Sequence, residues 1–339
     1  MMQQESNVHS GSGRNELLRE LWQRFRPNEP LELTEGESGM NNVTVMGSSG
    51  GESFVLRVYN NYGNMEAVKL EHEMLDKLGK RSELPFLVPR PLVNEAGETV
   101  VELSDGRTGA VFSYIEGVRP SGASERDAFQ LGEAAGRLIN TIKDMELIGK
   151  PQYSPYYALA DSYAAMTGEK MAALAGASPL LAGKSEALAA IQLHREETER
   201  QCHEVAALPQ QWIHGDLVFN NALSDGSRIT GILDFEFVTV DCRAMELAVL
   251  IVDLIKPWNR DAATSIRAVI QGFTSQVSLN KEELCLLPVL IKLRLLDVAL
   301  HFAVRFSDGI DSDEVLAGII DDTMYGLHWL EQHSVLPES

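Results

Sequence analysis

The sequence predicts an α+β protein with a small lobe built on an antiparallel sheet and a larger lobe made mostly of helices. Strand-like alternation of apolar and polar residues is concentrated in the first third of the chain, around one helix with an apolar stripe. From Ser124 onward helical spacing dominates, and one polar segment, Gln211 to Glu236, interrupts it. We therefore predict a first lobe over residues 14–116 and a second lobe over residues 117–339.

The N-terminal elements can be assigned in order. Residues 1–13 are polar and rich in Ser, Gly and Gln, so we expect them to be disordered. A helix should follow from Asn15 to Phe25, where Leu and aromatic residues recur at helical spacing. The next segment, residues 31–45, reads as two extended pieces around a loop of glycine and small polar residues that includes Ser38. Such a loop can bring backbone N–H groups near phosphates, although surface hairpins have the same composition.

A buried pair of charges is predicted in the first lobe. The strand over residues 53–59 places Val55 and Arg57 on one face. The next helix turns Glu71 inward with its apolar stripe. An inward carboxylate usually has a partner, and Arg57 is the natural one, with Glu73 as the alternative acid. A surface arginine on an edge strand is the simpler interpretation.

The remaining elements complete the two lobes. Two strands, residues 99–103 and 109–114, should end the first lobe, joined by an Asp-Gly turn. The second lobe should contain helices over residues 124–142, 156–171, 185–208, 261–276, 281–305 and 313–333.

The polar segment QWIHGDLVFNNALSDGSRITGILDFE carries the candidate chemistry. Asn221 follows Asp216 by five residues, and an Asp-Gly pair then reverses the chain into a strand that ends at Asp234. The hairpin thus returns Asp234 beside the loop. Phosphoryl transfer needs a carboxylate to orient the attacking hydroxyl and a divalent metal, and Mg²⁺ prefers oxygen ligands. Asp216, Asn221, Asp234 and Glu236 offer such oxygens; a hairpin with solvated acids is the alternative.

The motif HGDLVFNN, followed by ILDFE, resembles the aminoglycoside phosphotransferase and choline kinase superfamily, which has a protein-kinase-like two-lobe fold. This resemblance implies that Asp216 is the catalytic base, that Asn221 and Asp234 bind Mg²⁺, and that His214 is a structural turn residue. Glu236 stands where many members carry another acidic or small polar residue. The subfamily stays open, with type II homoserine kinases among the candidates.

The resemblance extends into the first lobe. Arg57 stands at the strand position where the aminoglycoside enzymes have a lysine on the nucleotide phosphates, and Glu71 matches its helix partner. Val55 would lie under the adenine, and backbone groups near Ser113 and Ile115, in the linker between the lobes, would bind the purine edge. A plain strand end before a glycine turn is the alternative for that linker. The implied phosphate donor is ATP, with GTP as the alternative, and the implied metal is Mg²⁺.

Two helices of the second lobe carry further candidates. DCRAMELA resembles the family's Asp-Leu-Ala helix start, with Glu246 in place of the usual Asp. We expect Glu246 to brace the catalytic loop, unless it only offsets the helix dipole. Arg294, His301 and Arg305 recur near one face of a later helix. They either line an acceptor pocket or, more simply, belong to a polar helix face.

Composition limits the partners. The 339 residues carry a formal net charge of −20, with 49 acidic and 29 basic side chains. No run of Lys or Arg could follow a phosphate backbone, so we expect neither nucleic acid nor membrane surfaces as partners. Cys202, Cys242 and Cys285 are far apart and lack metal-ligand spacing, which argues against a disulfide framework or a zinc site. Without a signal-like or spanning apolar run, the protein is expected to be cytoplasmic.

Together these observations predict a small-molecule kinase that phosphorylates a hydroxyl group. The acceptor could be an aminoglycoside, choline or ethanolamine, homoserine, or a sugar, because the helices that would form its pocket carry no readable motif. The alternative is a kinase-like nucleotide-binding scaffold without turnover, since Arg57 departs from the family's lysine. The oligomeric state cannot be predicted.

Overall fold

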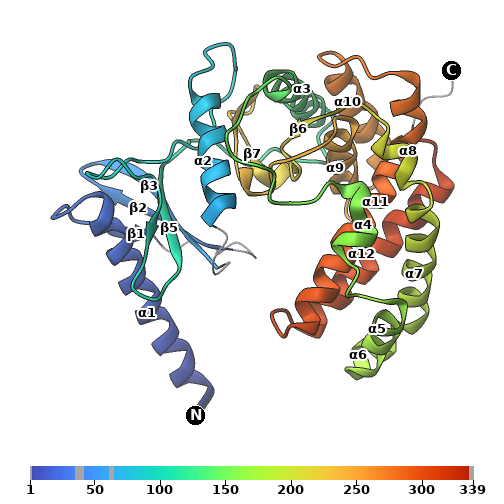
Figure 1. Ribbon diagram of the computed structural model, residues 1–339, viewed down its shortest axis with the longest axis horizontal. Coiled ribbons are helices and arrows are strands. Elements are labelled where there is room, and N and C mark those ends of the chain that lie inside the picture. The colour runs from blue at the N-terminus through green and yellow to red at the C-terminus, as the bar shows by residue number, and fades with distance from the viewer. Residues whose placement is uncertain (1, 35–41, 61–64, 336–339) are drawn as a thin grey trace.

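The computed structural model describes residues 2–34, 42–60 and 65–335, and side chains from residue 13 onward. It has two lobes (Figure 1). The first contains an antiparallel sheet in the order β1-β2-β3-β5-β4, and the second is mostly helical, as predicted. Ser38, the predicted phosphate-loop residue, lies outside the described residues. The division of the chain at residues 116 and 117 stays a prediction.

The sheet of the first lobe has short outer strands and long central ones. Its strands are β1 (Glu32–Thr34), β2 (Asn42–Ser49), β3 (Glu52–Tyr59), β4 (Val101–Glu102) and β5 (Thr108–Ser113). The turn between β2 and β3 is tight because Gly50 and Gly51 adopt positive φ angles of 60° and 85°, which favour glycine. The predicted alternation along β3 is present, with Phe54, Leu56 and Val58 in one core cluster.

The two faces of the sheet are covered by different helices. Helix α1 (Met2–Phe25) packs Leu18, Leu21 and Trp22 into the same cluster as the inner residues of β3. This helix begins at Met2 rather than at Asn15, so helical backbone covers the segment expected to be disordered. The buried side chains of α1, from Leu17 to Phe25, lie in the segment where the spacing of apolar residues predicted a helix.

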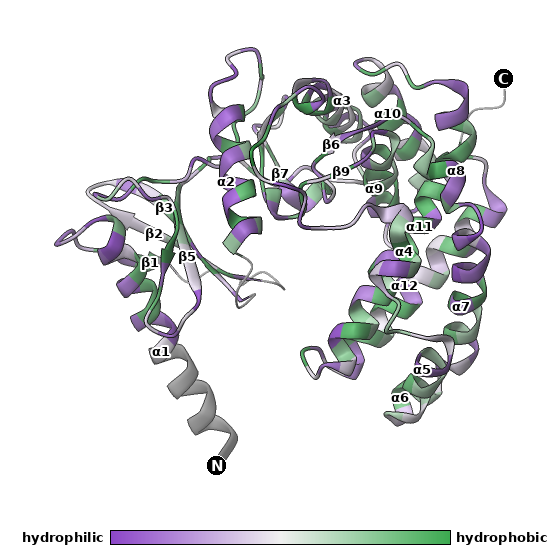
Figure 2. Ribbon diagram, in the orientation of Figure 1, coloured by the Kyte–Doolittle hydropathy of each residue, from purple (hydrophilic) through white to green (hydrophobic). Residues whose placement is uncertain are grey.

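Helix α2 (Met65–Gly79) lies on the side of the sheet that faces the second lobe (Figure 1). It has an apolar stripe, which Figure 2 shows as alternating green and purple along the ribbon. Glu71 is buried in this stripe, with only 2% of its surface exposed. The helix therefore carries a carboxylate into the space between the lobes.

The second lobe is built on six long helices around a hairpin-rich segment. The long helices are α3 (Glu125–Ile142), α7 (Ser185–Glu199), α9 (Ala244–Leu254), α10 (Ala262–Thr274), α11 (Lys281–Ser307) and α12 (Asp313–Gln332). Figure 2 shows α9 as the most uniformly hydrophobic of them, and all but one of its residues are buried. It is the centre of the lobe's core. Among the described residues, no helix has the length and apolarity needed to cross a membrane.

Two of the predicted helices are broken into pieces. The shorter elements are η1 (Tyr156–Ala158), α4 (Leu159–Ser162), α5 (Gly168–Ala173), η2 (Leu174–Gly176), α6 (Pro179–Ala182) and α8 (Cys202–Ala206). The prediction of one helix over residues 156–171 is wrong because Thr167 restarts the chain as an N-cap, with its side chain accepting from Lys170 N. The predicted helix over residues 185–208 likewise ends at Glu199 before α8 begins.

Helices α3 and α10 cross at very close range. A Cβ added at Gly132 of α3 would collide with the carbonyl oxygen of Val269, and one at Gly272 of α10 would collide with that of Phe129. Only glycine permits such an approach of two backbones. This crossing fixes α10 against the helix that follows the linker between the lobes.

The polar segment forms two small antiparallel pairs. Their elements are β6 (Gln210–Ile213), η3 (Phe219–Asn221), β7 (Ala222–Ser224), β8 (Ile229–Ile232), η4 (Phe235–Phe237) and β9 (Thr239–Cys242). Strand β7 pairs with β8, and β6 pairs with β9. Strand β8 also bonds to the first lobe, since Leu87 N donates to Thr230 O at 2.8 Å. The hairpin that returns Asp234 toward Asp216 is thus anchored to both lobes.

Candidate active site

The His-Gly-Asp turn is held by its own backbone and by His214. Gly215 has φ +81°, and a Cβ there would lie 2.7 Å from Phe237 O, so the turn requires glycine. The imidazole of His214 is buried, with Nε2 2.9 Å from Leu233 O and Nδ1 3.3 Å from Asp216 N. These contacts fit an imidazole that donates from Nε2 and accepts at Nδ1. His214 is a structural residue in this fold, as predicted.

Glu246 of α9 supports the same turn through hydrogen bonds to its backbone. Its Oε2 accepts from the backbone N–H groups of His214 at 2.7 Å and Gly215 at 3.2 Å. The carboxyl is fully buried, and burial raises its pKa above the ordinary value although the two N–H groups act in the opposite direction. The predicted bracing contact is therefore present.

Asp216 is held on both of its carboxylate oxygens. Asn221 Nδ2 donates to Asp216 O at 2.9 Å and to Oδ2 at 3.3 Å. Arg294 of α11 donates from one terminal nitrogen to Asp216 Oδ1 and from the other to Tyr156 Oη at 2.7 Å. The Tyr156 hydroxyl in turn donates to Gly215 O at 2.7 Å. The carboxylate therefore has one defined orientation.

Asp234 lies just beyond β8, so the prediction that the strand continues to this residue is wrong. Its backbone is left-handed, with φ 63° and ψ 68°, a conformation that non-glycine residues adopt rarely and mostly at constrained sites. Leu233 N still donates to Asn221 O at 2.8 Å, in register with the pairing of Ala222 and Ile232, and the left-handed backbone of Asp234 then ends the extended run. This bond continues the register of the hairpin and brings Asn221 close to Asp234.

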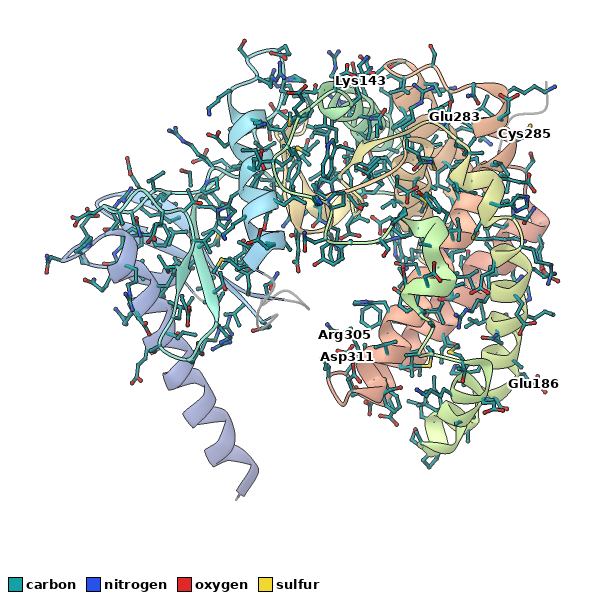
Figure 3. All side chains as sticks on the ribbon, viewed as in Figure 1. Lys143, Glu186, Glu283, Cys285, Arg305 and Asp311 are labelled. Atoms are coloured by element: carbon teal, nitrogen blue, oxygen red, sulfur yellow. The ribbon has the colours of Figure 1, made fainter. Side chains whose placement is uncertain are left out.

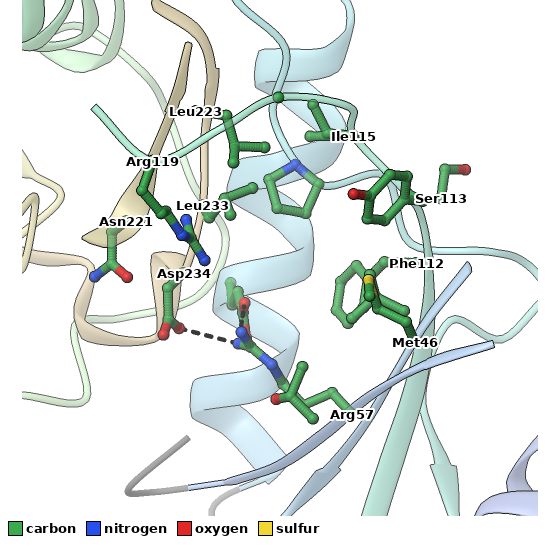
Figure 4. A pocket seen from close by; sticks show the side chains of 16 residues that line it. Met46, Arg57, Phe112, Ser113, Ile115, Arg119, Asn221, Leu223, Leu233 and Asp234 are labelled. Atoms are coloured by element: carbon green, nitrogen blue, oxygen red, sulfur yellow. Dashed lines mark hydrogen bonds and ion pairs between the residues drawn. The ribbon is translucent and has the colours of Figure 1, made fainter. Parts of the chain in front are cut away.

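Arg57 connects Asp234 with α2. Its guanidinium donates to Asp234 Oδ1 at 3.0 Å and to Glu71 Oε1 at 3.4 Å (Figure 4). Tyr59 Oη also donates to Glu71, at 3.0 Å. The alternative acid, Glu73, instead accepts from backbone N–H groups elsewhere. The predicted contact of Arg57 with Glu71 is present, and the surface interpretation of Arg57 is wrong.

Burial and charge act against each other in this pair. Burial would lower the pKa of Arg57, but the carboxylates of Asp234 and Glu71 outweigh it and raise the pKa above its ordinary value. Burial raises the pKa of Glu71 to about 7, although Arg57 opposes the shift. The Arg57 guanidinium therefore stays charged at every accessible pH.

Glu236 faces the first lobe. Its Oε2 accepts from Asn42 Nδ2 of β2 at 2.7 Å, and the side chain is buried. Burial and the nearby charge of Asp234 raise the pKa of Glu236 above its ordinary value. This contact joins the start of β2 to the turn that carries Asp234.

A cavity of about 320 Å³ lies between the lobes (Figure 4). Its walls are apolar toward the linker, and its charged end contains Arg57 and Asp234. The predicted nucleotide-binding residues that line it are Val55, Arg57, Glu71, Ser113 and Ile115. Ser113 N donates to Arg90 O at 3.0 Å. The structure thus brings these five residues to one cavity.

Asn221 and Asp234 provide oxygen atoms suited to a hard cation. Both line the charged end of the cavity. The amide nitrogen of Asn221 is used on Asp216, so its Oδ1 and the Oδ2 of Asp234 have no hydrogen-bond partner among the described residues. One carboxylate and one amide oxygen, with waters, are the donors that Mg²⁺ takes in nucleotide sites. The described residues contain no group of three His, Cys, Asp or Glu side chains suited to a metal.

Sequence reasoning missed one arginine of the site and left the role of another open. Arg119, just past the linker, enters the cavity beside Asp234 and Leu223, and its guanidinium donates to Ala222 O at 3.3 Å (Figure 4). No spacing in the sequence marks it. Arg294 was noticed, but the simpler interpretation of a polar helix face is wrong for it, since its side chain is only 15% exposed and contacts the candidate base.

These features define a class of protein, the phosphotransferases with a kinase-like fold. A model of the phosphotransferase enzyme family matches residues 32–274, which include the cavity and the His-Gly-Asp loop. The chain belongs to this family. The predicted family and enzyme class, a phosphotransferase of the small-molecule kinase type, are confirmed.

Curated relatives carry one recurring name. The homoserine kinase of Afipia carboxidovorans is 28% identical over 223 residues, which cover 64% of this chain and 63% of that protein. The chain thus spans a little less than two thirds of this relative's length. The homoserine kinase of Rhodopseudomonas palustris strain BisA53 is 26% identical over 285 residues, 83% of this chain and 80% of the relative.

Solved structures support the fold. A microcompartment-associated aminopropanol kinase has a TM-score of 0.70 at 19% identity, covering 91% of this chain and 94% of the other. An amicoumacin kinase in complex with AMP-PNP and Ca²⁺ has a TM-score of 0.66 at 14% identity, covering 98% and 95%. At these identities the likeness establishes the two-lobe kinase-like fold, which was predicted.

Proposed function

We propose that this protein transfers the γ-phosphoryl group of ATP to a hydroxyl of a small molecule. The observation that carries the proposal is the convergence of Asp216, Asn221 and Asp234 at the charged end of the cavity between the lobes. A base, two metal-type oxygens and a cation, Arg57, are the parts that phosphoryl transfer requires.

The nucleotide would occupy the cavity with its base at the linker. Among the described residues Ile115 N has no hydrogen-bond partner, so it and the Ser113 carbonyl could meet the purine edge. Val55 would cover the ring, and Arg57 would turn toward the phosphates while Glu71 holds its side chain. Asn221 and Asp234 would bind Mg²⁺, which neutralises phosphate charge when bound.

Asp216 would act on the acceptor. Its carboxylate is oriented by Asn221 and Arg294, so an incoming hydroxyl would meet an acceptor oxygen already in position. Asp216 would orient that hydroxyl and receive its proton as the oxygen bonds to phosphorus. Because the curated relatives are named homoserine kinases, homoserine is the first acceptor to test.

The test is Asp216→Asn, measured with ATP and Mg²⁺ against homoserine, amino alcohols, choline, sugars and aminoglycosides. The amide keeps the shape of the side chain but cannot accept the proton, so we expect turnover to fall by about 10²–10⁴-fold. Affinity for a non-hydrolysable ATP analogue should stay within about twofold, since the lost interaction belongs to the transition state. Undiminished transfer by Asp216→Asn would refute the assignment, and nucleotide binding by the unmutated protein without transfer would favour the scaffold alternative.

A further inference from the structure

Arg119 is a charged residue of the cavity between the lobes that the proposed function leaves without a role. The charged side chains among the described residues that line this cavity are Arg57, Glu71, Arg119 and Asp234. The first, second and last of these belong to the proposed nucleotide and metal site. Arg119 follows the linker and enters the same cavity from another element (Figure 4).

The two arginines of the cavity differ in how their charges are compensated. Arg57 is paired with two carboxylates, Asp234 at 3.0 Å and Glu71 at 3.4 Å. Within the described part of the chain Arg119 forms no ion pair, and its guanidinium donates only to a neutral group, the carbonyl of Ala222, at 3.3 Å. An anion that enters the cavity would therefore find Arg57 already paired and Arg119 available.

The backbone around Arg119 is held in place before any ligand binds. Val118 N donates to Ser224 O at 2.9 Å, and Ser224 N donates to Val118 O at 2.8 Å, which fixes the segment after the linker to β7. Pro120 restricts the preceding residue to an extended backbone. The bond to Ala222 O uses one N–H of the guanidinium, and this group has five. The side chain is thus positioned with donors to spare.

The position of the guanidinium indicates which part of a nucleotide it would meet. The linker end of the cavity is apolar, whereas Arg119 points toward the charged end, near Asp234 (Figure 4). Burial lowers the pKa of Arg119 and the carboxylate of Asp234 opposes this shift, so the two groups lie within electrostatic range. The residue is still exposed in part, so an incoming anion can reach it. The planar fork of arginine matches phosphate oxygens.

We propose that Arg119 is a phosphate-binding residue of the nucleotide site. Its guanidinium would keep the bond to Ala222 O and donate its remaining N–H groups to phosphate oxygens, on the side of the cavity opposite β3. The phosphates would then be held between one arginine from each side, Arg57 before the linker and Arg119 after it. This inference rests on the proposed function and deepens it by adding a residue that recognises the phosphate groups.

The experiment compares a ligand that has phosphates with one that lacks them. Calorimetry on the full-length protein, with Mg²⁺ present, measures the affinity for a non-hydrolysable ATP analogue and for adenosine. Arg119→Met keeps a long apolar side chain but removes the charge, so we expect the affinity for the ATP analogue to fall about tenfold, as the loss of a charge-assisted hydrogen bond typically costs. The affinity for adenosine should stay within about twofold, because adenosine offers no phosphate to Arg119.

A conservative substitution tests the role of the charge itself. Arg119→Lys keeps a cation that binds phosphate as a point charge but lacks the fork of donors. We expect its affinity for the ATP analogue to lie between those of the unmutated protein and Arg119→Met. A role of Arg119 in packing alone would not give this order.

Two other arginines serve as controls. Arg126 also follows the linker and also donates to a backbone carbonyl of the β7–β8 hairpin at 3.3 Å, that of Ser227, but it does not line the cavity. Arg305 pairs with Asp311 at 2.6 Å near the end of α11 (Figure 3). Arg126→Met and Arg305→Met should bind the ATP analogue and adenosine as the unmutated protein does.

The outcomes separate this inference from the proposed function. An unchanged affinity of Arg119→Met for the ATP analogue would overturn the phosphate role while leaving the kinase proposal in place. Equal losses for the ATP analogue and adenosine would also overturn it, because Arg119 would then act on the ribose, the base or the fold. A loss confined to the ATP analogue would support the phosphate role even if no transfer to an acceptor is detected, and in that case the kinase proposal would be the one that fails.

Discussion

At the scale of single residues, Asp234 offers the most direct test. Its left-handed backbone and its ion pair with Arg57 hold one oxygen toward the first lobe and leave the other for a metal. We predict that Asp234→Ala loses the Mg²⁺-dependent part of nucleotide affinity, by about tenfold or more, because one of two protein ligands is removed. Calorimetric titration with an ATP analogue, with and without Mg²⁺, measures this difference.

The control for Asp234 lies on the same hairpin. Asp225 is in the exposed β7–β8 turn, where it accepts from Ser227 N at 2.8 Å. Asp225→Ala should leave the Mg²⁺ dependence of nucleotide binding unchanged. An Asp234→Ala protein that still binds nucleotide more tightly with Mg²⁺ would contradict the assigned role.

A contact between two residues could be predicted where both lie on elements with a periodic apolar pattern and these elements face each other. The alternation along β3 and the stripe on α2 were sufficient to predict the contact of Arg57 with Glu71. The contact of Arg294 with Asp216 joins residues 78 positions apart, on elements whose relative placement no local pattern encodes. The early end of β8 was missed because the left-handed backbone of Asp234 cannot be read from the alternation of apolar residues.

At the scale of elements, the crossing of α3 and α10 can be tested by adding one methyl group. Gly132→Ala would press a Cβ against the backbone of Val269, which cannot yield like a flexible side chain. We expect a loss of about 1–3 kcal/mol in the free energy of unfolding, as overpacking typically costs. Urea denaturation followed by circular dichroism measures it.

A second glycine provides the matched control. Gly318 lies within α12, is exposed, and has no atom within 4 Å of an added Cβ. Gly318→Ala should stabilise the protein by about 0.5–1 kcal/mol, because alanine is the better helix former. If both substitutions changed stability in the same direction, the close crossing would not be what limits position 132.

Element boundaries followed local signals only in part. Helix α11 has a capping box in which the Asn280 side chain and Glu283 satisfy each other's backbone N–H groups, and its predicted start at residue 281 was correct. The segment over residues 156–171 has apolar residues at nearly helical spacing, yet Tyr156 makes two tertiary hydrogen bonds, from its N–H to Asp241 and from its hydroxyl to Gly215. Such bonds are invisible in a periodic pattern.

At the scale of the whole molecule, buried carboxylates should make stability depend on pH. Burial raises the pKa of Glu71 to about 7 and that of Asp241 to about 6. The unfolded chain releases these protons near pH 4, at about the ordinary values. Between these limits the folded protein binds more protons, so the free energy of unfolding should fall as the pH rises from about 5 to about 7.

The substitution Glu71→Gln tests this dependence. It removes the larger of the two shifts, so we expect a shallower fall in the free energy of unfolding over about pH 5–7. Glu66→Gln, on the exposed side of the same helix, serves as the control and should keep the original slope. A Glu71→Gln protein with an unchanged slope would mean that this carboxyl does not hold its proton in the folded state.

The two-lobe architecture was predictable because strands and helices are segregated along the chain, and the family motif was long enough to be specific. The arrangement of the helices in the second lobe was less predictable, because these helices pack through side chains that are far apart in the sequence.

The position of Arg294 has a consequence for how such a protein could diversify. The match to the family model ends at residue 274, and the helix pair α11 and α12 follows it. If acceptor choice resides in this pair, a descendant could acquire a new substrate by altering its C-terminal helices while inheriting an intact phosphate-handling machinery. The part of the chain that handles the phosphate donor and the part that recognises the acceptor could then change independently.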